Sequence, residues 1–384
     1  MMNFDQHKTR GFDFHNPVRI RFGVGCLEEI REITKGYHVI LLTTPGFSRR
    51  GVVERVKKLI GPALIEVVDT IGPNPELDNL ERTARMLQHL SIDMIVALGG
   101  GSVIDTAKAM SVMLSRDLET FSLRSHLEND ALELDGVGIP VVAVPTTAGT
   151  GSEVTPFATV WDSVSMRKYS LTGSQVFPHI ALLDPELTLS LPREVTIVTG
   201  LDTISHAFES VWNRNANSLT ILLATEALRI GLPTLKSLPD ALDDIGLRSR
   251  MLWASTLAGL AISQTRTALA HSISYPLTMH YGMPHGLACS FTLPSILCFN
   301  AKADDGRLEE LALTLGFTTV EALNISLQEL FQGLGVSKML REYIRTVEQL
   351  EDLVPDMFTR GRSDNNMHQA DYDDLVDLGG IIQA

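Results

Sequence analysis

The sequence predicts an α/β domain built on a parallel sheet, followed by an all-helical domain. In the first half of the chain, short apolar runs end repeatedly in Gly, Pro or Thr, as buried parallel strands followed by turns do. Beyond about residue 190, strand signals all but disappear and segments with helical periodicity dominate. This change predicts a boundary near 190, with an α/β domain over 1–190 and a helical domain over 191–384.

Each element follows from its own pattern. Residues 18–22 alternate apolar and polar side chains as an edge strand does, and the apolar runs that predict further strands are 39–42, 64–68, 94–98 and 141–144. Helices are expected over 52–60 and 77–90, and the segment 183–192 is expected to link the domains. In the second half, the helical pattern covers 195–212, 219–236, 246–264, 267–279, 318–332 and 335–346.

Composition narrows the class of protein. The chain has 384 residues, of which 44% are hydrophobic and 20% charged, as is ordinary for a globular protein with two cores. Its net charge of −14 disfavours nucleic acid or an anionic membrane as a main partner, and no apolar run reaches the roughly 18 residues of a membrane span. The three cysteines show no paired spacing and residues 1–11 lack a signal-peptide core, so a reduced, cytoplasmic location is expected.

Two loops in the first half have the composition of nucleotide-binding loops. A glycine triplet, Gly99 to Gly101, follows the predicted strand 94–98 and opens a helix, so that bare N–H groups and a helix N-terminus can bind a pyrophosphate. A glycine triplet by itself more often marks a turn. The loop 145–153 follows the strand 141–144 and carries hydroxyls that suit a nicotinamide or ribose, the alternative being helix capping.

A carboxylate and three imidazoles stand out in the second half. Asp202 and His206 are four residues apart, so on a helix they project from one face. His271 and His285 could converge on that pair, and this set of ligand types suits Fe²⁺ or Zn²⁺ with a coordination position left open. The alternative is a pair of surface residues with two unrelated histidines.

These patterns resemble those of the iron-containing (group III) alcohol dehydrogenases. The matching stretches are Gly-x-Asp-x-x-x-His-Ala at 200–207, Pro284-His285-Gly286 after His271, Pro-Thr-Thr-x-Gly-Thr-Gly-Ser-Glu at 145–153, and Gly-Gly-Gly-Ser-x-x-Asp-x-x-Lys at 99–108. The resemblance runs from about residue 14 to the last helices. It implies a Rossmann-like parallel sheet in the fold that this family shares with dehydroquinate synthase, a homodimer, and metal ligation by Asp202, His206, His271 and His285. The residues that it assigns to a nicotinamide cofactor are Thr44, Asn74, Gly99, Gly100, Gly101, Ser102, Asp105, Thr146, Thr147, Thr150 and Lys168.

A nucleotide loop combined with a metal site implies an enzyme that transfers a hydride between a nicotinamide and a small alcohol or aldehyde. Fe²⁺, or alternatively Zn²⁺, would act as a Lewis acid on the oxygen, with the substrate held between the domains. We expect NAD as the cofactor. NADP is the alternative, because Thr44 stands where NAD-using relatives often carry an Asp, and Arg49 follows shortly after.

Two departures from the family pattern bear on catalysis and substrate. Many members carry a second His four residues after the third ligand, but this chain has Tyr275, which either donates the proton that completes the alcohol or only shapes the pocket. Arg266 lies five residues before His271 and suits bidentate bonding to an anion, the alternative being a surface arginine paired with a carboxylate. The segments 266–277 and 285–290 resemble a subgroup assigned to phosphonoacetaldehyde or sulfoacetaldehyde reduction, which predicts an aldehyde with an anionic tail.

Other functions stay open at this point. A neutral short-chain alcohol or a semialdehyde is the alternative substrate. A dehydroquinate-synthase-like lyase, which would cycle the hydride internally, and a non-enzymatic regulator that binds metal or nucleotide are the alternative classes. The C-terminal segment 356–384 shows no pattern to which chemistry can be assigned.

Overall fold

The structure, a computed structural model, describes residues 11–129, 134, 136–346 and 348–379. Its contacts divide the chain into two compact units. The α/β unit consists of residues 16–147 and 151–190, and the helical unit contains the chain from Leu191 onward together with 11–15 and 148–150. The segment 148–150 therefore leaves the α/β unit within one of the two loops that the sequence singled out.

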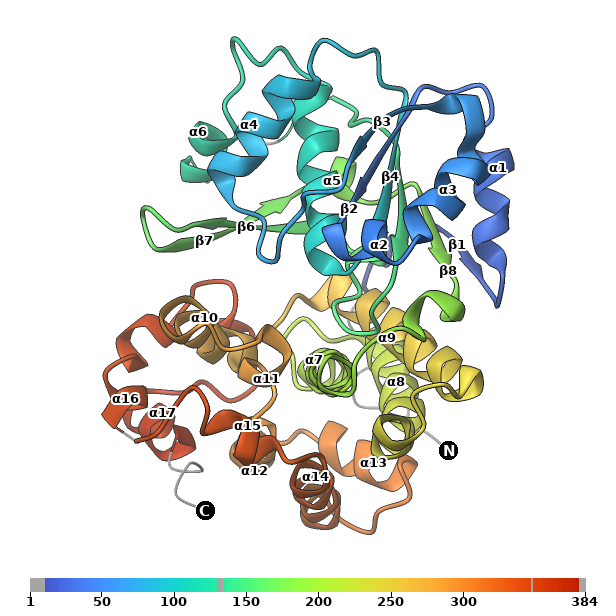
Figure 1. Cartoon of the computed structure of the whole chain (residues 1–384). Coiled ribbons are helices and arrows are strands. Elements are labelled where there is room, and N and C mark those ends of the chain that lie inside the picture. The colour runs from blue at the N-terminus through green and yellow to red at the C-terminus, as the bar shows by residue number, and fades with distance from the viewer. Residues whose placement is uncertain (1–10, 130–133, 135, 347, 380–384) are drawn as a thin grey trace. The chain divides into compact units, whose positions relative to one another are not determined.

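A six-stranded sheet forms the centre of the α/β unit, and all of its strand pairs are parallel (Figure 1). Most of the strands are buried at every residue, which explains their continuous apolar sequences, whereas the edge strand β1 is largely exposed. Across the sheet the order is β1 (Arg19–Phe22), β8 (Ile180–Leu183), β5 (Val141–Pro145), β4 (Met94–Gly99), β2 (Val39–Thr43) and β3 (Leu64–Val68).

Helices cover both faces of this sheet (Figure 1). Side chains alternate between the faces along each strand, so Ile40 and Leu42 of β2 join one hydrophobic core while Val39 and Leu41 join the other. The first core is closed by α4 (Leu77–Leu87), α5 (Gly101–Leu114) and α6 (Leu123–Glu128), and the second by α1 (Ile30–Ile33) and α3 (Val52–Ile60). This is the predicted parallel sheet with helices on both sides.

The order of the strands reverses between β2 and β4. The chain adds β3 on one side of β2, whereas β4 and then β5 lie on the other side. In open parallel sheets, ligands bind at the carboxyl ends of the strands that flank such a reversal. Those ends are Thr43, followed by Thr44, on β2 and Gly99 on β4.

Three strands and several short helices, α2 (Pro45–Arg49) among them, were not predicted from the sequence. β6 (Phe157–Asp162) and β7 (Arg167–Thr172) form a separate antiparallel hairpin, and β7 is polar and mostly not buried, so it lacks an apolar run. β8 has only four residues and runs directly into the segment predicted as a linker. The helix α2 begins at the proline of a predicted turn.

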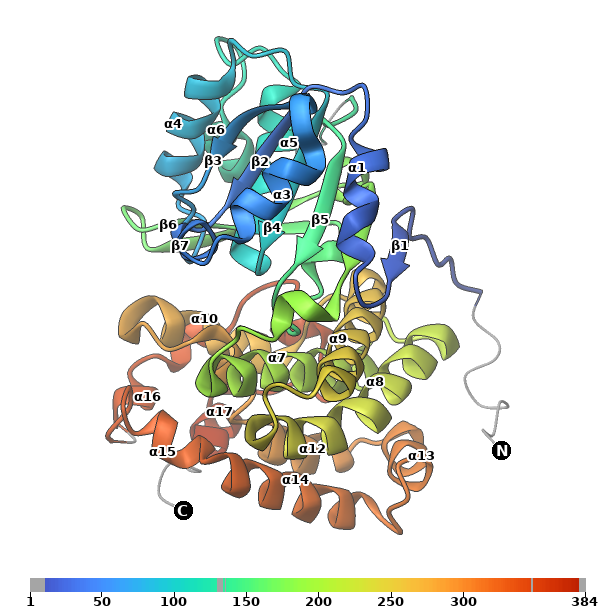
Figure 2. The ribbon, with the colours of Figure 1, turned by 45° about the vertical axis from the view of Figure 1, so that its right-hand side comes forward.

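In the helical unit, α7 (Arg193–Val211), α8 (Ser218–Ser237) and α9 (Ile245–Thr265) pack against one another (Figure 2). Their bounds lie within two residues of those predicted. The side chains of Asn217 and Asp244 accept hydrogen bonds from first-turn N–H groups of α8 and α9, which explains where these two helices begin.

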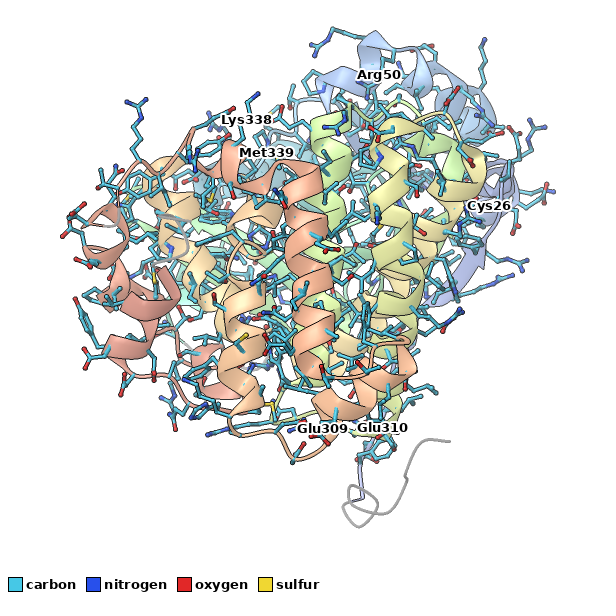
Figure 3. All side chains as sticks on the ribbon, turned by 90° about the horizontal axis from the view of Figure 1, so that it is seen from below. Cys26, Arg50, Glu309, Glu310, Lys338 and Met339 are labelled. Atoms are coloured by element: carbon cyan, nitrogen blue, oxygen red, sulfur yellow. The ribbon has the colours of Figure 1, made fainter. Side chains whose placement is uncertain are left out.

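Shorter helices complete the unit. Figure 3 labels residues of the two helices that precede and follow α14 in the chain. These are Glu309 and Glu310 of α13, and Lys338 and Met339 of α15. The predicted helix 335–346 is wrong in length, because α15 ends at Leu340 and turns follow. The remaining helices are α10 (Leu269–Tyr281), α11 (His285–Ala288), α12 (Leu293–Ala301), α13 (Arg307–Thr314), α14 (Val320–Leu334), α15 (Val336–Leu340), α16 (Glu348–Glu351) and α17 (Tyr372–Gly379).

One helix has the length and composition of a membrane span. This stretch, Ser218–Asp240, has a mean hydropathy of 1.2 and includes α8. α8 packs against both α7 and α9, and it carries an ion pair between Glu226 and Arg229. These contacts bury 44% of the apolar stretch within the helical unit, and Leu222 stays exposed.

Candidate functional site

One face of α7 carries the acidic and imidazole side chains around which the site is built. Asp202, His206 and Glu209 follow one another at intervals of four and three residues, so they lie on one side of the helix, and all three are buried. His271 comes from the first turn of α10, and His285 is the first residue of α11. The structure therefore brings the predicted carboxylate and the three predicted histidines together.

The distances among these side chains suit a divalent metal. The Nε2 atoms of His206, His271 and His285 lie 3.5, 3.6 and 3.9 Å from the same Oδ1 atom of Asp202. Ligands about 2.1 Å from a tetrahedral metal are separated from one another by about 3.4 Å. The four side chains thus stand close to the spacing that coordination to one ion requires.

The other ring nitrogen of two histidines is already held by the protein. Nδ1 of His271 lies 2.7 Å from Glu209 Oε2, and Nδ1 of His206 lies 3.2 Å from the carbonyl oxygen of Gly149. Both partners are acceptors, so they select the tautomer in which Nδ1 carries the proton and Nε2 is free to ligate. Nε2 of His271 is buried and, among the described residues, has no hydrogen-bond partner. A buried ring nitrogen without a hydrogen-bond partner in this place fits a cation that replaces its proton.

Glu209 is a functional residue that the sequence analysis missed. Besides His271 Nδ1, its carboxylate accepts hydrogen bonds from the backbone N–H groups of Ala268 and His271, at 2.8 and 3.1 Å. A negative charge at this point caps the N-terminus of α10, which has no capping side chain of its own. Although burial raises the pKa of Glu209, the charge and hydrogen bond of His271 outweigh it and hold the pKa below its usual value. Its spacing after Asp202 and His206 was the available signal.

Cys289 is a second neighbour that the sequence did not assign. Its Sγ lies 3.3 Å from Asp202 Oδ1, and the possible ligand atoms of Asp202, His271, His285 and Cys289 all lie within 4.8 Å of one another. Burial raises the pKa of Cys289 to about 12, so without a metal the sulfur is a thiol that donates to the carboxylate.

Gly286 explains how His285 reaches this position. A Cβ atom on Gly286 would lie 2.0 Å from the carbonyl oxygen of Val198 on α7, so only glycine allows α11 to approach α7 this closely. The hydroxyl of Ser205 on α7 donates to the carbonyl of Cys289 at 2.6 Å and holds the other end of α11. The short helix is thereby fixed to the same helix that carries Asp202.

Without a metal, the pKa values of the proposed ligands are shifted in different directions. Although burial raises the pKa of Asp202, the neighbouring His206 and the contacts with His271 and His285 outweigh it and hold this pKa well below its usual range. Burial lowers the pKa of His206. Burial also works against a charge on His271, but the neighbouring Cys289 and Glu209, with the contact to Asp202, raise its pKa well above the usual value.

Metal binding is therefore expected to release a proton and to weaken as the pH falls. Near neutral pH the metal-free protein carries a proton on His271, which a metal must displace, and below the pKa of His271 the affinity should fall about tenfold per pH unit. Titration calorimetry with Zn²⁺ between about pH 6 and pH 8, in two buffers of different ionisation enthalpy, would measure both effects. An affinity that does not depend on pH, without proton release, would contradict this prediction.

In the α/β unit, most of the residues assigned to the cofactor gather at the carboxyl ends of β4 and β5. Gly99 ends β4, Gly100 caps α5 and Gly101 begins that helix. The backbone N–H of Thr146 donates to the carbonyl of Gly99, and a Cβ on Gly100 would lie 3.1 Å from Thr147 Oγ1. These backbone groups and hydroxyls stand beside the strand reversal, where a dinucleotide is expected.

Three further residues that the resemblance assigns to the cofactor lie at the same strand reversal. The hydroxyl of Ser102 accepts a hydrogen bond from the backbone N–H of Asn74, which has a φ of 55°. Thr44 precedes α2 at the end of β2 and has an extended backbone. These residues come from separate loops at the end of the sheet where β2 and β4 are neighbours.

The remaining cofactor residues have other surroundings. Asp105 is partly buried, and its two oxygens accept hydrogen bonds from Ser152 Oγ at 2.5 Å and from the backbone N–H of Thr159 at 2.8 Å. Lys168 lies on β7 with its Nζ 5.2 Å from the ring centre of Trp161. Thr150 belongs to the helical unit. A cofactor contact for these three residues, as for the others that the resemblance assigns, stays a prediction.

Tyr275 and Arg266 both lie near the start of α10. Tyr275 is one helical turn after His271, and its hydroxyl accepts a hydrogen bond of 3.1 Å from Arg362 Nε. Arg266 follows the last residue of α9, with a φ of 63°, and its side chain is exposed. Partial desolvation and then the charge of Arg362 lower the pKa of Arg266.

Comparison with known proteins identifies the family. Residues 17–185 match the family model described as iron-containing alcohol dehydrogenase, and residues 196–379 match the model of the C-terminal part of that family. The phosphonoacetaldehyde reductase of Streptomyces viridochromogenes is 36% identical over 259 residues, a stretch that covers 67% of this chain and 65% of that protein. The NADPH-dependent butanol dehydrogenase of Clostridium saccharobutylicum is 31% identical, with 86% of each chain covered.

A solved structure agrees with these matches. The crystal structure of sulfoacetaldehyde reductase from Bifidobacterium kashiwanohense in complex with NAD⁺ superposes with a TM-score of 0.91 at 30% identity, over 98% of this chain and 99% of that one. The predicted fold class and the prediction of a metal-dependent, NAD(P)-linked oxidoreductase are confirmed. Since the family models cover both units, the chain belongs to the iron-containing alcohol dehydrogenase family.

Proposed function

We propose that this enzyme reduces a short aldehyde with an anionic tail, phosphonoacetaldehyde or sulfoacetaldehyde, to the corresponding alcohol. The observation that carries the proposal is the placement of Arg266. The turn from Arg266 to Ala268 leads directly into α10, and Glu209 bonds the backbone of both Ala268 and His271. The exposed Arg266 therefore lies in a turn whose last residue is bonded by the same carboxylate that orients a proposed metal ligand. A guanidinium is well suited to a phosphonate or sulfonate.

The residues of the helical unit have separate tasks in this reaction. Asp202, His206, His271 and His285 would hold the metal, while Glu209 fixes the ring of His271. When bound, the metal polarises the carbonyl oxygen and the nicotinamide supplies the hydride.

The proton that completes the alcohol needs a donor. Tyr275 is our candidate, because its oxygen accepts from Arg362 and its own hydrogen is therefore directed elsewhere.

The cofactor we propose is NADH. Asp69 directly follows β3 and accepts a hydrogen bond of 2.6 Å from Ser48 on α2, so a carboxylate lies beside the end of β2 and disfavours a 2′-phosphate. NADPH is the second candidate, because Arg50 and Thr44 lie close together beside Gly46 and could bind a 2′-phosphate. A Cβ atom on Gly46 would lie 3.3 Å from Arg50 Nη1 and 3.6 Å from Thr44 Oγ1. The homodimer and the cytoplasmic location stay predictions of the sequence, and sedimentation analysis would test the first.

A substrate screen tests the proposed function. With Fe²⁺ or Zn²⁺ restored, kcat/KM would be measured for phosphonoacetaldehyde, sulfoacetaldehyde, succinic semialdehyde and butanal, each with NADH and NADPH. We expect the phosphono- or sulfo-aldehyde to exceed butanal at least about tenfold, because a hydrogen bond to a charged group contributes about 1.5–3 kcal/mol. A wild-type enzyme that prefers butanal would overturn the proposal in favour of a neutral substrate.

Replacing Arg266 is expected to reduce that preference. Arg266→Ala should lower kcat/KM for the anionic aldehydes about 10- to 100-fold relative to butanal, mainly through KM. Arg250→Ala, which removes an exposed arginine on the same helix, α9, is the matched control and should leave the ratio unchanged. An unchanged ratio in Arg266→Ala would show that the anionic tail is bound elsewhere.

A further inference from the structure

The C-terminal segment 357–367, in which no chemistry was predicted, is hydrogen-bonded to the start of α10 and to the turn before it. The backbone N–H of Thr359 donates to the hydroxyl of Ser272 at 3.0 Å, and that hydroxyl donates to the carbonyl of Met357. Asn365 Nδ2 donates to the carbonyl of Thr267 at 2.9 Å and to that of Gly361 at 2.8 Å. The segment is therefore held against the turn that carries Arg266.

The residues that follow α7 are hydrogen-bonded both to the turn that carries Arg266 and to the C-terminal segment. Asn213, which follows α7, donates from its side chain to the carbonyl of Arg266 at 3.1 Å. The next residue, Arg214, donates its backbone N–H to the carbonyl of Asn365 at 2.7 Å. Asn213 also forms an antiparallel bridge with Asn366, which is buried. The positions of Arg266 and Arg362 relative to each other are thus determined by several hydrogen bonds within the helical unit.

Arg362 is directed toward Tyr275 by this arrangement. Its Nε donates to Tyr275 Oη at 3.1 Å, and its Nη1 donates to the carbonyl of Gly361 at 2.7 Å. In the described part of the chain, Arg362 forms no ion pair with a carboxylate, and its Nη2 has no hydrogen-bond acceptor. The charge of Arg362 is close enough to Arg266 to lower its pKa. Two like charges beside each other repel, and an anion bound between them would remove that repulsion.

We propose that Arg362 and Arg266 together bind the tail of the substrate, and that this pair of guanidinium groups selects a dianionic phosphonate over a monoanionic sulfonate. Two positive charges match a tail of two negative charges, and the bond from Arg362 Nε to Tyr275 Oη holds one of these charges beside the residue one helical turn after His271. This inference rests on the proposed function, since it assigns a further residue to the same substrate site. It also assigns a role to the segment that follows residue 356.

The experiment compares two aldehydes that differ in the charge of the tail. We would measure kcat/KM for phosphonoacetaldehyde, sulfoacetaldehyde and butanal with the metal-loaded wild type, Arg362→Gln, Arg362→Lys and the control Arg360→Gln. Arg360 is exposed and lies two residues from Arg362 on the same segment. For the wild type we expect the phosphonate to be preferred over the sulfonate.

The variants should separate a role in binding from a role in folding. Arg362→Gln should lower the phosphonate-to-butanal ratio of kcat/KM about 10- to 100-fold and the sulfonate-to-butanal ratio less, while Arg362→Lys should recover part of the loss. Arg360→Gln should change neither ratio. A general structural defect would lower the rates for all three aldehydes together and leave the ratios as they are.

The pH dependence gives an independent measurement. The dianion of an alkylphosphonate takes up a proton at a pKa somewhat above the value of about 6 of a phosphate ester, whereas a sulfonate stays a monoanion. Calorimetric binding of methylphosphonate should therefore weaken in the wild type as the pH falls from about 8 to about 5.5, and that of methanesulfonate should not. In Arg362→Gln the difference between the two ligands should become smaller.

Two outcomes would be distinguishable. If the wild type prefers anionic aldehydes and loses this preference in Arg266→Ala but not in Arg362→Gln, the role of Arg362 is overturned and the proposed function stands. The same holds if methylphosphonate and methanesulfonate bind the wild type alike at every pH. If the wild type does not distinguish anionic aldehydes from butanal, the proposed function and the inference both fail.

Discussion

Asp202→Ala is expected to abolish stable metal binding and to lower kcat/KM by at least about a thousand-fold, which corresponds to about 4 kcal/mol. The Oδ1 atom of Asp202 lies within 3.9 Å of the Nε2 atoms of all three histidines, so its removal takes away the one atom that they share. It also takes away the only one of these four side chains that carries a negative charge, and the remaining imidazoles would compensate the charge of a divalent ion poorly.

Metal content and turnover would be measured together for Asp202→Ala and Asp202→Asn. Both variants would be dialysed against Fe²⁺ or Zn²⁺ and analysed by mass spectrometry for bound metal. Asn keeps the shape of the side chain and tests the charge alone. Glu194→Ala, which removes an exposed carboxylate from the first turn of the same helix, is the control. Full metal content with kcat/KM within tenfold of the wild type would show that Asp202 is not a ligand.

Glu209→Gln is expected to weaken metal binding about 10- to 100-fold although Glu209 is not itself a proposed ligand. The carboxylate oxygen that accepts from Nδ1 of His271 also accepts from the N–H of Ala268, so in Gln the amide oxygen would take this place and the NH2 group would face the N–H of His271. A neutral amide with one opposed donor holds the His271 ring less firmly and makes Nε2 a weaker ligand. The same change removes the negative charge that caps α10 at Ala268.

Further variants separate the role of Glu209 in metal binding from its role in stability. Glu209→Ala leaves the N–H groups of Ala268 and His271 without their acceptor, so the free energy of unfolding should fall by about 1–3 kcal/mol. Glu209→Asp keeps the acceptor and should recover part of the metal affinity. Glu226→Gln on α8 alters an exposed carboxylate and serves as the control. If Glu209→Gln binds metal as tightly as the wild type, the carboxylate of Glu209 does not strengthen His271 as a ligand.

Local patterns were sufficient to predict much of the fold. Strands β2 and β4 are buried at every residue, so their apolar runs and terminal turns identified them. The long helices α7, α8 and α9 were predicted to within two residues because their side chains follow helical periodicity. The hairpin of β6 and β7 was not predicted because β7 is polar and mostly not buried, and β6 has no continuous apolar run. Its position depends on contacts with elements remote in sequence.

The sequence by itself determined which side chains could meet at the proposed metal site. The interval of four residues between Asp202 and His206 puts them on one helical face, and Gly286 marks the close approach that brings His285 to them. Only the tertiary structure decided which groups support these side chains. Glu209 is 62 residues from His271, and Arg362 is 87 residues from Tyr275. A hydrogen bond across such a separation leaves no periodicity in the sequence, because it depends on how α7, α10 and the C-terminal segment pack.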